Sequence, residues 1–398
     1  MDSRQLSDDP GQQALYTLIQ RSVDRAGGWL GFDRFMALAL YAPGLGYYAN
    51  QLRKFGISPQ SGSDFVTAPE LSKWFGRTLA KQVAEALEAT HTDTVWEFGA
   101  GSGALALQLL EALGNKVKRY TIVDVSGSLR ARQQTTLAAY IDKVQWLDAL
   151  PEQISGVVVG NEVLDAMPVQ LLHRKNGSWY ERGLVWETQD QDSKVSAELV
   201  SSADKASQKN LQALKWNDRV TDARPPIEIE GKHDYLTEIH LQAHAFIQTL
   251  ADRLLVSQKS TGKGGAVFLI DYGFPEHEYF HPQRHMGTLM CHQLHCADPD
   301  PLSDVGAKDI TAHVDFTGVA LAAQDAGLQI LGYTSQAHFL INCGLLEPLV
   351  EAPLEEKAMV QKLITEHEMG ELFKVIALTK QLECTLTGFQ LQDKRASL

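Results

Sequence analysis

A glycine-rich turn between an apolar strand and a helix constrains this chain more than any other feature. We predict the strand over 94–98 and the helix over 103–113, and the turn between them has the sequence EFGAGSG at 97–103. Glycines permit a tight turn and let a ligand touch the main chain. The free N–H groups at the start of the helix favour a carboxylate or a phosphate. The turn therefore predicts a nucleotide-type site on an α/β sheet.

Strand and helix patterns alternate after this turn. Apolar strands are predicted over 119–124, 144–147, 156–160, 266–271 and 373–378, with a further helix over 127–140. Such alternation predicts a parallel, doubly wound, Rossmann-like sheet. The N-terminal ninety residues are instead helical and loop-rich, with helices expected over 12–26, 31–41 and from Pro69 to about Leu87.

A polar stretch interrupts the alternation after residue 170. It contains strand-like pieces such as 179–185 and a predicted helix over 234–258. We therefore expect an α/β fold with an N-terminal helical segment and an inserted α+β region. The expected parts are an N-terminal lid segment (1–90), a cofactor-binding core (91–170 and 262–380), an inserted substrate or partner region (171–261) and a C-terminal tail (381–398).

The composition limits which binding partners and which cellular compartment we expect for this protein. The 398 residues carry a net charge of -13, which argues against a nucleic-acid partner. The acidity fits a basic protein or peptide substrate, although many cytosolic enzymes are equally acidic. Four cysteines form no disulfide framework, and neither a targeting segment nor a bilayer-length apolar run is recognisable. We expect a cytoplasmic protein without membrane insertion, and the sequence leaves its oligomeric state open.

The glycine turn alone leaves three readings open, because Gly99-x-Gly101-x-x-Ala104 also satisfies a relaxed dinucleotide fingerprint. The readings are S-adenosylmethionine, a dinucleotide and a purely structural turn. Glu97 favours the first, since an acid two residues before the first glycine can hold a methionine ammonium group. Gly103, as a third alternating glycine, favours it too. We therefore expect the methionine part of S-adenosylmethionine over Gly99, Ala100, Gly101 and Gly103.

Polar residues that follow the apolar strands are expected at the carboxyl edge of the sheet, where such folds bind ligands. Asp124, next to Val125, can accept both ribose hydroxyls. Asp148, with Ala149, can accept the adenine amino group, although a cap of a turn is an equally good reading. Asp271 ends a later strand at the same edge.

The segment 161–165 follows the most apolar of these strands. Asn161 and Glu162 have no role in a core there, and methyl transfer needs a nucleophile held in line with the methyl group. Glu162 and Asp165 can supply the paired carboxylates that fix a guanidinium. The alternative for Asp165 is the N-cap of a following helix.

Two further segments hold candidate residues. The run from Cys291 to Cys296 fits no common zinc spacing, so no metal is expected. A histidine in the substrate pocket and ordinary packing both remain open, and His295 is the candidate proton acceptor. The loop 62–70 is expected as a lid or floor over the cofactor through Asp64, Thr67 and Pro69, or else as a capping loop with Thr67 as N-cap.

An ordered set of motifs across residues 30–380 resembles the MidA family of class I S-adenosylmethionine-dependent methyltransferases. The motifs are 62–70 with Phe75-Gly76, 97–103, 161–169, Asp271-Tyr272-Gly273, Gly287-Thr288-Leu289, 309–316 and 336–340. The resemblance implies a methyltransferase fold, with Gly99, Gly101 and Gly103 at the cofactor, Asp124 on the ribose and Asn161 and Glu162 facing the methyl group.

The mitochondrial branch of this family is a complex I assembly factor that dimethylates an arginine of a core subunit. The chain is more similar to the bacterial branch. The resemblance thus implies a protein substrate, such as a respiratory-complex subunit. Ala100 and Ser102 stand where the family often has Pro and Arg, Val163-Leu164 replaces a more aromatic pair, and Met290 stands where Arg usually follows Gly-Thr-Leu.

Alternatives to a protein arginine methyltransferase stay open from the sequence. One is a methyltransferase for a small molecule. Another is a non-enzymatic, S-adenosylmethionine-binding assembly chaperone whose insertion grips a client. A dehydrogenase is a more distant fourth, which nicotinamide binding would test.

Overall fold

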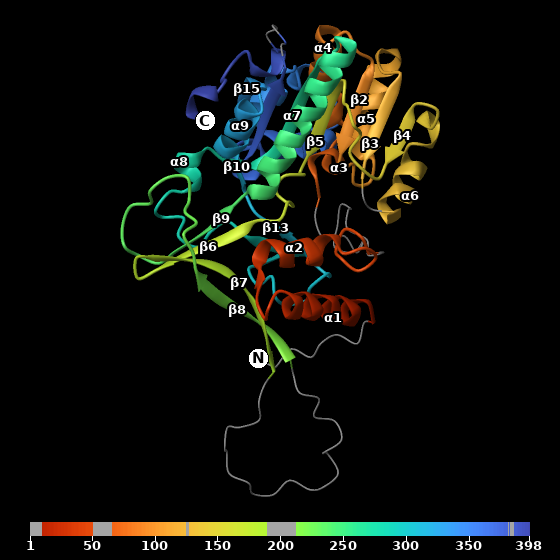
Figure 1. Ribbon diagram of the computed structural model, residues 1–398. Helices are drawn as coiled ribbons and strands as arrows, with labels where there is room; N and C mark the ends of the chain where they lie inside the picture. The colour runs from red at the N-terminus through yellow and green to blue at the C-terminus, as the bar shows by residue number, and fades with distance from the viewer. Residues whose placement is uncertain (1–9, 51–65, 125–126, 189–211, 381, 383–385) are drawn as a thin grey trace, which may run out of the picture.

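A computed structural model describes residues 10–50, 66–124, 127–188, 212–380, 382 and 386–398 (Figure 1). A large central sheet carries helices on both faces. A second sheet with the helices α1 (Pro10–Arg25) and α2 (Phe32–Tyr41) lies at one end of it. No described helix is both long enough and apolar enough to span a bilayer.

The central sheet has the strand order β15-β16-β10-β5-β2-β3-β4, and β14 pairs with β10. The strands are β2 (Thr94–Phe98), β3 (Arg119–Val123), β4 (Val144–Leu147), β5 (Gly156–Asn161), β10 (Gly265–Phe274), β14 (Val314–Asp315), β15 (Gln329–Ser335) and β16 (Phe373–Thr379). The predicted α/β fold is confirmed. The sheet is mixed rather than wholly parallel, because β16 runs antiparallel to both of its neighbours.

Two apolar layers bury the faces of this sheet. One face packs against α4 (Lys73–Ala89), α5 (Ala104–Leu113), α10 (Gln336–Asn342) and α12 (Leu354–Ile364). The other face packs against α7 (Leu241–Thr261) and α9 (Phe316–Asp325). The helix α6 (Gly127–Thr136) follows β3, and the short helices α8 (Glu276–Tyr279) and α11 (Leu346–Leu349) lie in later connections. The apolar strands predicted from the sequence thus lie between two layers of helices.

The predicted helix from Pro69 to Leu87 is wrong as one continuous element. It is split into α3 (Ala68–Leu71) and α4, because Ser72 has extended backbone angles (φ -153°). The Ser72 hydroxyl accepts a hydrogen bond from the Trp74 N–H at 3.3 Å and so caps α4. Before this break, Glu70 of α3 accepts a hydrogen bond from Ser102 of the glycine turn.

The predicted helix over 234–258 is wrong in its first residues. Tyr235–Ile239 forms the strand β9, which pairs with the strand β6 (Gln170–Lys175), and α7 begins only at Leu241. Tyr235, Thr237 and Glu238 are fully buried in this strand, so sheet pairing overrides the helical pattern. Since α7 packs on the central sheet, we propose that the inserted region ends before it.

The second sheet is antiparallel. It contains β1 (Leu30–Gly31), β6 (Gln170–Lys175), β7 (Ser178–Thr188), β8 (Gln212–Val220) and β9, and β7 pairs with β1, β6 and β8. The strand predicted at 179–185 is confirmed as part of β7. A third small sheet contains β11 (Met290–Gln293), β12 (Cys296–Asp298) and β13 (Asp309–Thr311). The helices α1 and α2 share an apolar core with β6, β7 and β13.

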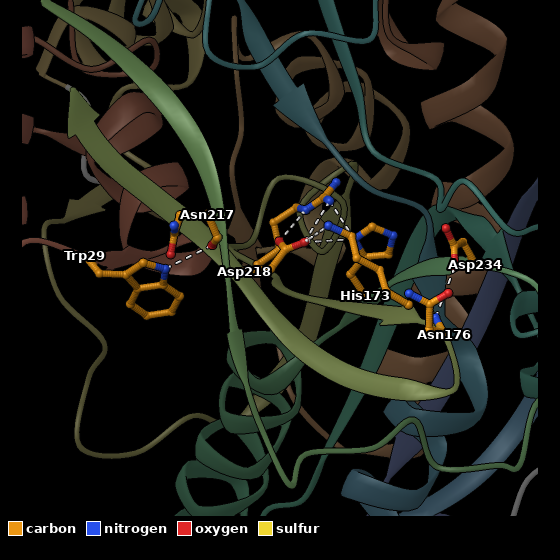
Figure 2. Close-up of polar contacts among 8 residues, drawn as sticks. Trp29, His173, Asn176, Asn217, Asp218 and Asp234 are labelled. Carbon is orange, nitrogen blue, oxygen red and sulfur yellow. Dashed lines mark hydrogen bonds and ion pairs between the residues drawn. The ribbon is translucent and has the colours of Figure 1, made fainter. Parts of the chain in front are cut away.

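Asp218 of β8 ties the strands of the second sheet together (Figure 2). Its carboxylate accepts hydrogen bonds from Arg182 on β7, at 2.8 and 3.1 Å, and lies 2.6 Å from Lys175 Nζ and 3.1 Å from His173 Nδ1 on β6. Burial alone raises the pKa of Asp218, but the hydrogen bonds from His173, Arg182 and Lys175 outweigh it and hold the pKa well below its usual range. Asp218 is therefore charged at neutral pH.

We predict that Asp218→Asn lowers the free energy of unfolding by about 2 kcal/mol, because it leaves three basic side chains without their shared carboxylate. A carboxyl group with a lowered pKa stabilises the fold above its unfolded pKa of about 4 and loses that effect in more acidic solution. The difference between the two proteins should therefore shrink below about pH 4. Urea unfolding at several pH values measures it. Glu187→Gln, at an exposed ion pair with Lys215, is the control and should change little; an equal effect of both variants would contradict this role of Asp218.

Candidate active site

A deep cleft of about 1430 Å³ opens at the carboxyl ends of the central strands. The loops after β2, β3, β4 and β5 line one part of it. The end of α2, one side of α7 and the strand β13 line the rest. Single small-molecule sites are commonly about 300–1,000 Å³, so this cleft has room for a cofactor and a second ligand.

The glycine turn has the backbone conformation that the sequence predicts. Gly99, Gly101 and Gly103 have φ values of +64°, +53° and +85°, which side chains with a Cβ rarely adopt. A Cβ on Gly99 would also lie 3.1 Å from a methyl group of Val163. Gly99 and Gly101 line the cleft, with Ala100 between them. The turn thus offers main-chain atoms to a ligand.

Gln133 on α6 holds the turn against the next strand. Its side-chain N–H₂ donates to the carbonyl of Gly101 at 3.0 Å and to Asp124 Oδ2 at 2.8 Å. Its side-chain oxygen accepts from the Trp146 indole at 2.9 Å. Gln133 is fully buried, so it fixes the orientation of the Asp124 carboxylate relative to the turn. Sequence reasoning missed Gln133, because a glutamine in a polar helix carries no visible pattern.

Glu97 is a buried acid beside the turn. The Tyr120 hydroxyl donates to Glu97 Oε2 at 2.7 Å. The pKa of Glu97 is raised to about 8, mainly by burial; the Tyr120 hydrogen bond acts the other way, and the nearby Asp124 adds to the increase. A buried carboxyl group of this kind is stabilised in its charged form by a cationic ligand.

The α3 segment forms part of the cleft wall. Thr67, Pro69 and Glu70 line the cleft, and the Ser102 hydroxyl of the turn donates to Glu70. Gln108 on α5 donates to the Pro69 carbonyl at 2.7 Å. Thr67 occupies the N-cap position of α3 without a side-chain hydrogen bond to the helix. Two predicted contacts, Asp64 and Val125, lie outside the described residues.

Asp148 and Ala149 line the rim of the cleft after β4. The Asp148 side chain is 80% exposed and forms an ion pair with Arg130. The rim position leaves both sequence readings of Asp148 open, as a contact for the base of a nucleotide and as a partner for a surface cation.

Glu162 has a strained backbone at the end of β5. Its φ is +54°, which is uncommon for a residue other than glycine and is often found at functional sites. Asn161 donates its side-chain N–H₂ to Glu162 Oε1 at 2.8 Å. Burial, with a smaller contribution from the charge of Asp165, raises the pKa of Glu162 to about 8. Hydrogen bonds from Asn161 and from the Ala68 backbone act the other way.

Asp165 lies beside Glu162 and is 4% exposed. The Tyr272 hydroxyl donates to Asp165 Oδ2 at 2.6 Å. Burial raises the pKa of Asp165 to about 6, against the effect of this hydrogen bond. No helix follows residue 165, so the reading of Asp165 as a helix cap is wrong. The backbone N–H groups of residues 163, 164 and 165 instead donate to Asp271 Oδ2, which holds this loop in place.

Two buried oxygens in this part of the cleft have no hydrogen-bond partner among the described residues. They are Asn161 Oδ1 and Asp165 Oδ1. Glu162 and Asp165 also form no ion pair in the described part of the chain. Unpaired buried polar atoms are costly, at about 1–3 kcal/mol each. A hydrogen-bond donor of a ligand in the cleft would satisfy both oxygens.

Glu238 of β9 fixes another wall. It is fully buried and accepts hydrogen bonds from the Tyr279 hydroxyl and the Thr288 and Leu289 backbones at 2.8–3.1 Å. Thr288 and Leu289 line the cleft, whereas Tyr279 does not. The Gly287-Thr288-Leu289 motif is thus held from behind by one carboxylate.

The structure does not bring His295 to the cleft. His295 lies in the turn between β11 and β12, with φ +61°. His292 and His313 line the cleft instead, and burial lowers the pKa of His313 to about 4. Within the described ranges, no three His, Cys, Asp or Glu side chains are grouped as metal ligands would be.

Comparison with known proteins decides the family. Residues 78–334 match the family described as "Putative S-adenosyl-L-methionine-dependent methyltransferase". A protein from Burkholderia thailandensis, whose crystal structure was determined with bound S-adenosyl-homocysteine, is 44% identical in sequence to this chain. It has a TM-score of 0.86, and the match covers 98% of this chain and 99% of that one.

The chain belongs to this methyltransferase family. More distant relatives are named protein arginine methyltransferase NDUFAF7, mitochondrial. The Caenorhabditis elegans homologue is 26% identical over 93% of this chain and 89% of its own length. The mouse protein is 28% identical over 89% and 82%. The family resemblance and the S-adenosylmethionine cofactor expected from the sequence are both confirmed.

The residues of the cleft fit this cofactor. A methionine part carries an ammonium and a carboxylate, and the cleft offers the buried acid Glu97 and the N-terminus of α5. Asp124 offers a carboxylate oriented by Gln133 for paired hydroxyls. S-adenosylmethionine supplies a methyl group on a positively charged sulfur.

We predict that Gln133→Leu weakens S-adenosyl-homocysteine binding about 10- to 100-fold, because Asp124 and Gly101 lose the donor that orients them. Isothermal titration calorimetry measures the affinity. The neighbouring Gln134 is exposed on α6, so Gln134→Leu is a matched control and should bind normally. Normal affinity in Gln133→Leu would show that Gln133 does not position Asp124.

We also predict that cofactor affinity rises with pH through about 8. Glu97 has a raised pKa of about 8, so its carboxyl group is mostly neutral below that value and pairs poorly with an ammonium. Ionisation at higher pH restores the pairing. Calorimetry between about pH 6.5 and pH 8.5 should show this increase in wild type and a flatter profile in Glu97→Gln. Parallel profiles for both proteins would show that Glu97 does not bind the ammonium group of the cofactor.

Proposed function

We propose that the protein transfers a methyl group from S-adenosylmethionine to an arginine guanidinium of a protein substrate. The observation that supports it most directly is the pair Glu162 and Asp165. Asp165 is buried and Glu162 is half-buried beside the cofactor part of the cleft, and neither has a cationic partner among the described residues. The mitochondrial relatives are named as protein arginine methyltransferases, which agrees with this proposal.

The charges of the cleft favour a cationic acceptor. Arg284 is the sole Lys or Arg among the described lining residues. The acids that line the cleft are Glu70, Glu97, Asp124, Asp148, Glu162, Asp165 and Asp309. A guanidinium is planar and presents several N–H donors, so paired carboxylates bind it in a defined orientation. Asn161, through its free Oδ1, offers a further acceptor for an N–H group.

Each residue receives a role in this proposal. Glu97 holds the ammonium of the cofactor, and Asp124 its ribose. Asn161, Glu162 and Asp165 hold the guanidinium so that one nitrogen faces the methyl group in line with its bond to sulfur.

The proton balance assigns a further task to the carboxylates. An arginine side chain keeps its positive charge after methylation, so the nitrogen that gains a methyl group must lose one proton. We assign the acceptor as the Glu162 carboxylate. The bound cations keep Glu162 ionised, and its pKa rises again as the sulfur loses its positive charge on methyl transfer, so the carboxylate can then take up the proton.

The substrate is proposed to be an assembly client, such as a subunit of a respiratory complex, as the family resemblance implies. A folded or partly folded client would present its arginine through the wide cleft. Mass spectrometry of client proteins from cells with and without the enzyme identifies the methylated residue.

We predict that Glu162→Gln and Asp165→Asn each lower kcat about 10²- to 10³-fold, since both keep the size of the side chain and remove its charge. Affinity for S-adenosyl-homocysteine should stay within about threefold. The assay follows the mass of peptides with one arginine, and peptides with lysine or citrulline at that position are compared.

The exposed Glu152 is not among the lining residues, so Glu152→Gln is the control and should act like wild type. Undiminished transfer by the Glu162 and Asp165 variants would overturn the assignment. Methylation of the lysine peptide in preference to the arginine peptide would contradict the proposed acceptor.

A further inference from the structure

The cleft continues beyond the carboxylate pair to a wall that the proposed chemistry does not use. This wall is made by Tyr41 at the end of α2, by Tyr48 in the turn after it and by Asp309 of β13. All three line the cleft. We call these three residues the acceptor wall.

A hydrogen bond joins two distant parts of the chain in the acceptor wall. The Tyr48 hydroxyl donates to Asp309 Oδ2 at 2.9 Å, across a sequence separation of 261 residues. The backbone N–H of Ile310 donates to Asp309 Oδ1 at 2.9 Å. Asp309 is 3% exposed, so its carboxylate is held in one orientation by donors on both oxygens.

The acceptor wall belongs to the same electrostatic cluster as the carboxylate pair. The charge of Asp309 contributes to the raised pKa of Glu162. The charges of Asp309 and Asp165 also contribute, after burial, to the raised pKa of Tyr41 and of Tyr48. A cation bound between these acids would interact with all of them at once.

The two tyrosines place aromatic rings beside these acids. Their rings stack with centroids 5.5 Å apart and an angle of 18° between planes. The Tyr41 hydroxyl donates to the carbonyl of Ala166 at 2.8 Å, which fixes α2 to the segment that carries Glu162 and Asp165. Aromatic rings beside carboxylates favour a flat, weakly hydrated cation, and they favour guanidinium over a compact ammonium.

We propose that Tyr41, Tyr48 and Asp309 form the specificity-determining surface that selects a guanidinium as methyl acceptor. The proposal rests on the proposed function for its reaction, but it concerns recognition and is tested by binding. Tyr48 acts through Asp309, whose carboxylate it orients, and so is a positioning residue. Asp309 contacts the acceptor on the side away from the cofactor part of the cleft.

The test uses the full chain saturated with S-adenosyl-homocysteine, so that the cofactor part of the cleft is filled. Calorimetry with N-acetyl-arginine amide, its lysine counterpart and its citrulline counterpart measures acceptor binding without turnover. We expect the arginine probe to bind, the lysine probe to bind more weakly and the neutral citrulline probe not to bind. Equal affinity for the arginine and citrulline probes would overturn the proposal.

Two variants locate the recognition. Asp309→Asn should lower the affinity for the arginine probe about 10- to 100-fold. Tyr48→Phe keeps the ring and removes the hydroxyl, and should lower this affinity about three- to tenfold. Affinity for S-adenosyl-homocysteine and the melting temperature should stay close to wild type, which separates recognition from folding.

The matched control is Tyr235→Phe. Its hydroxyl donates to the carbonyl of His281 at 3.2 Å, and Tyr235 does not line the cleft. Probe affinity should not change in this variant. An arginine probe that binds Tyr48→Phe and Asp309→Asn as tightly as wild type would sink the proposal. Binding of the arginine probe without methyl transfer would support the acceptor wall and contradict the proposed reaction.

Discussion

The rest of the structure depends on a group of buried and half-buried carboxyl groups at one edge of the central sheet. Glu97, Asp124, Glu162 and Asp165 end or follow neighbouring parallel strands, so the topology alone brings them together. Burial and, to a smaller extent, the charges of neighbouring acids raise the pKa values of Glu97 and Glu162 to about 8. The arrangement is costly in free energy without a cationic ligand. S-adenosylmethionine, the cofactor of the family to which the chain belongs, is such a ligand.

The scaffold around this cluster supplies polar groups that orient each acid. Asp271 binds three successive backbone N–H groups of the segment 163–165, and Gln133 binds Asp124 and the glycine turn. The hydroxyl groups of Tyr120 and Tyr272 each donate a hydrogen bond to one acid of the cluster. Such bonds fix the carboxylates before any ligand arrives, which is the preorganisation that methyl transfer needs.

Features encoded by neighbouring residues could be predicted from the sequence, and features made by distant residues could not. The glycine turn, Asp124 and the segment 161–165 follow apolar strands, so local pattern placed them at one edge. Gln133 and the Tyr48–Asp309 bond depend on tertiary contacts. Which histidine of the segment 291–296 faces the cleft depends on the geometry of the β11–β12 hairpin, which the sequence does not show. His292 lines the cleft, while the predicted His295 lies in the turn. The antiparallel direction of β16 leaves no trace in its largely apolar sequence.

The most direct test of this account is the number of protons released when the cofactor binds. S-adenosylmethionine and S-adenosyl-homocysteine share an ammonium and differ in the charge on sulfur. Calorimetry near pH 7.5 in buffers of different ionisation enthalpy counts the protons for each. If the sulfur lies beside Glu162 and Asp165, its charge lowers their pKa values, and S-adenosylmethionine should release more protons, up to about one, with the excess lost in Glu162→Gln. Equal release for both ligands would contradict the placement of these carboxylates at the methyl group.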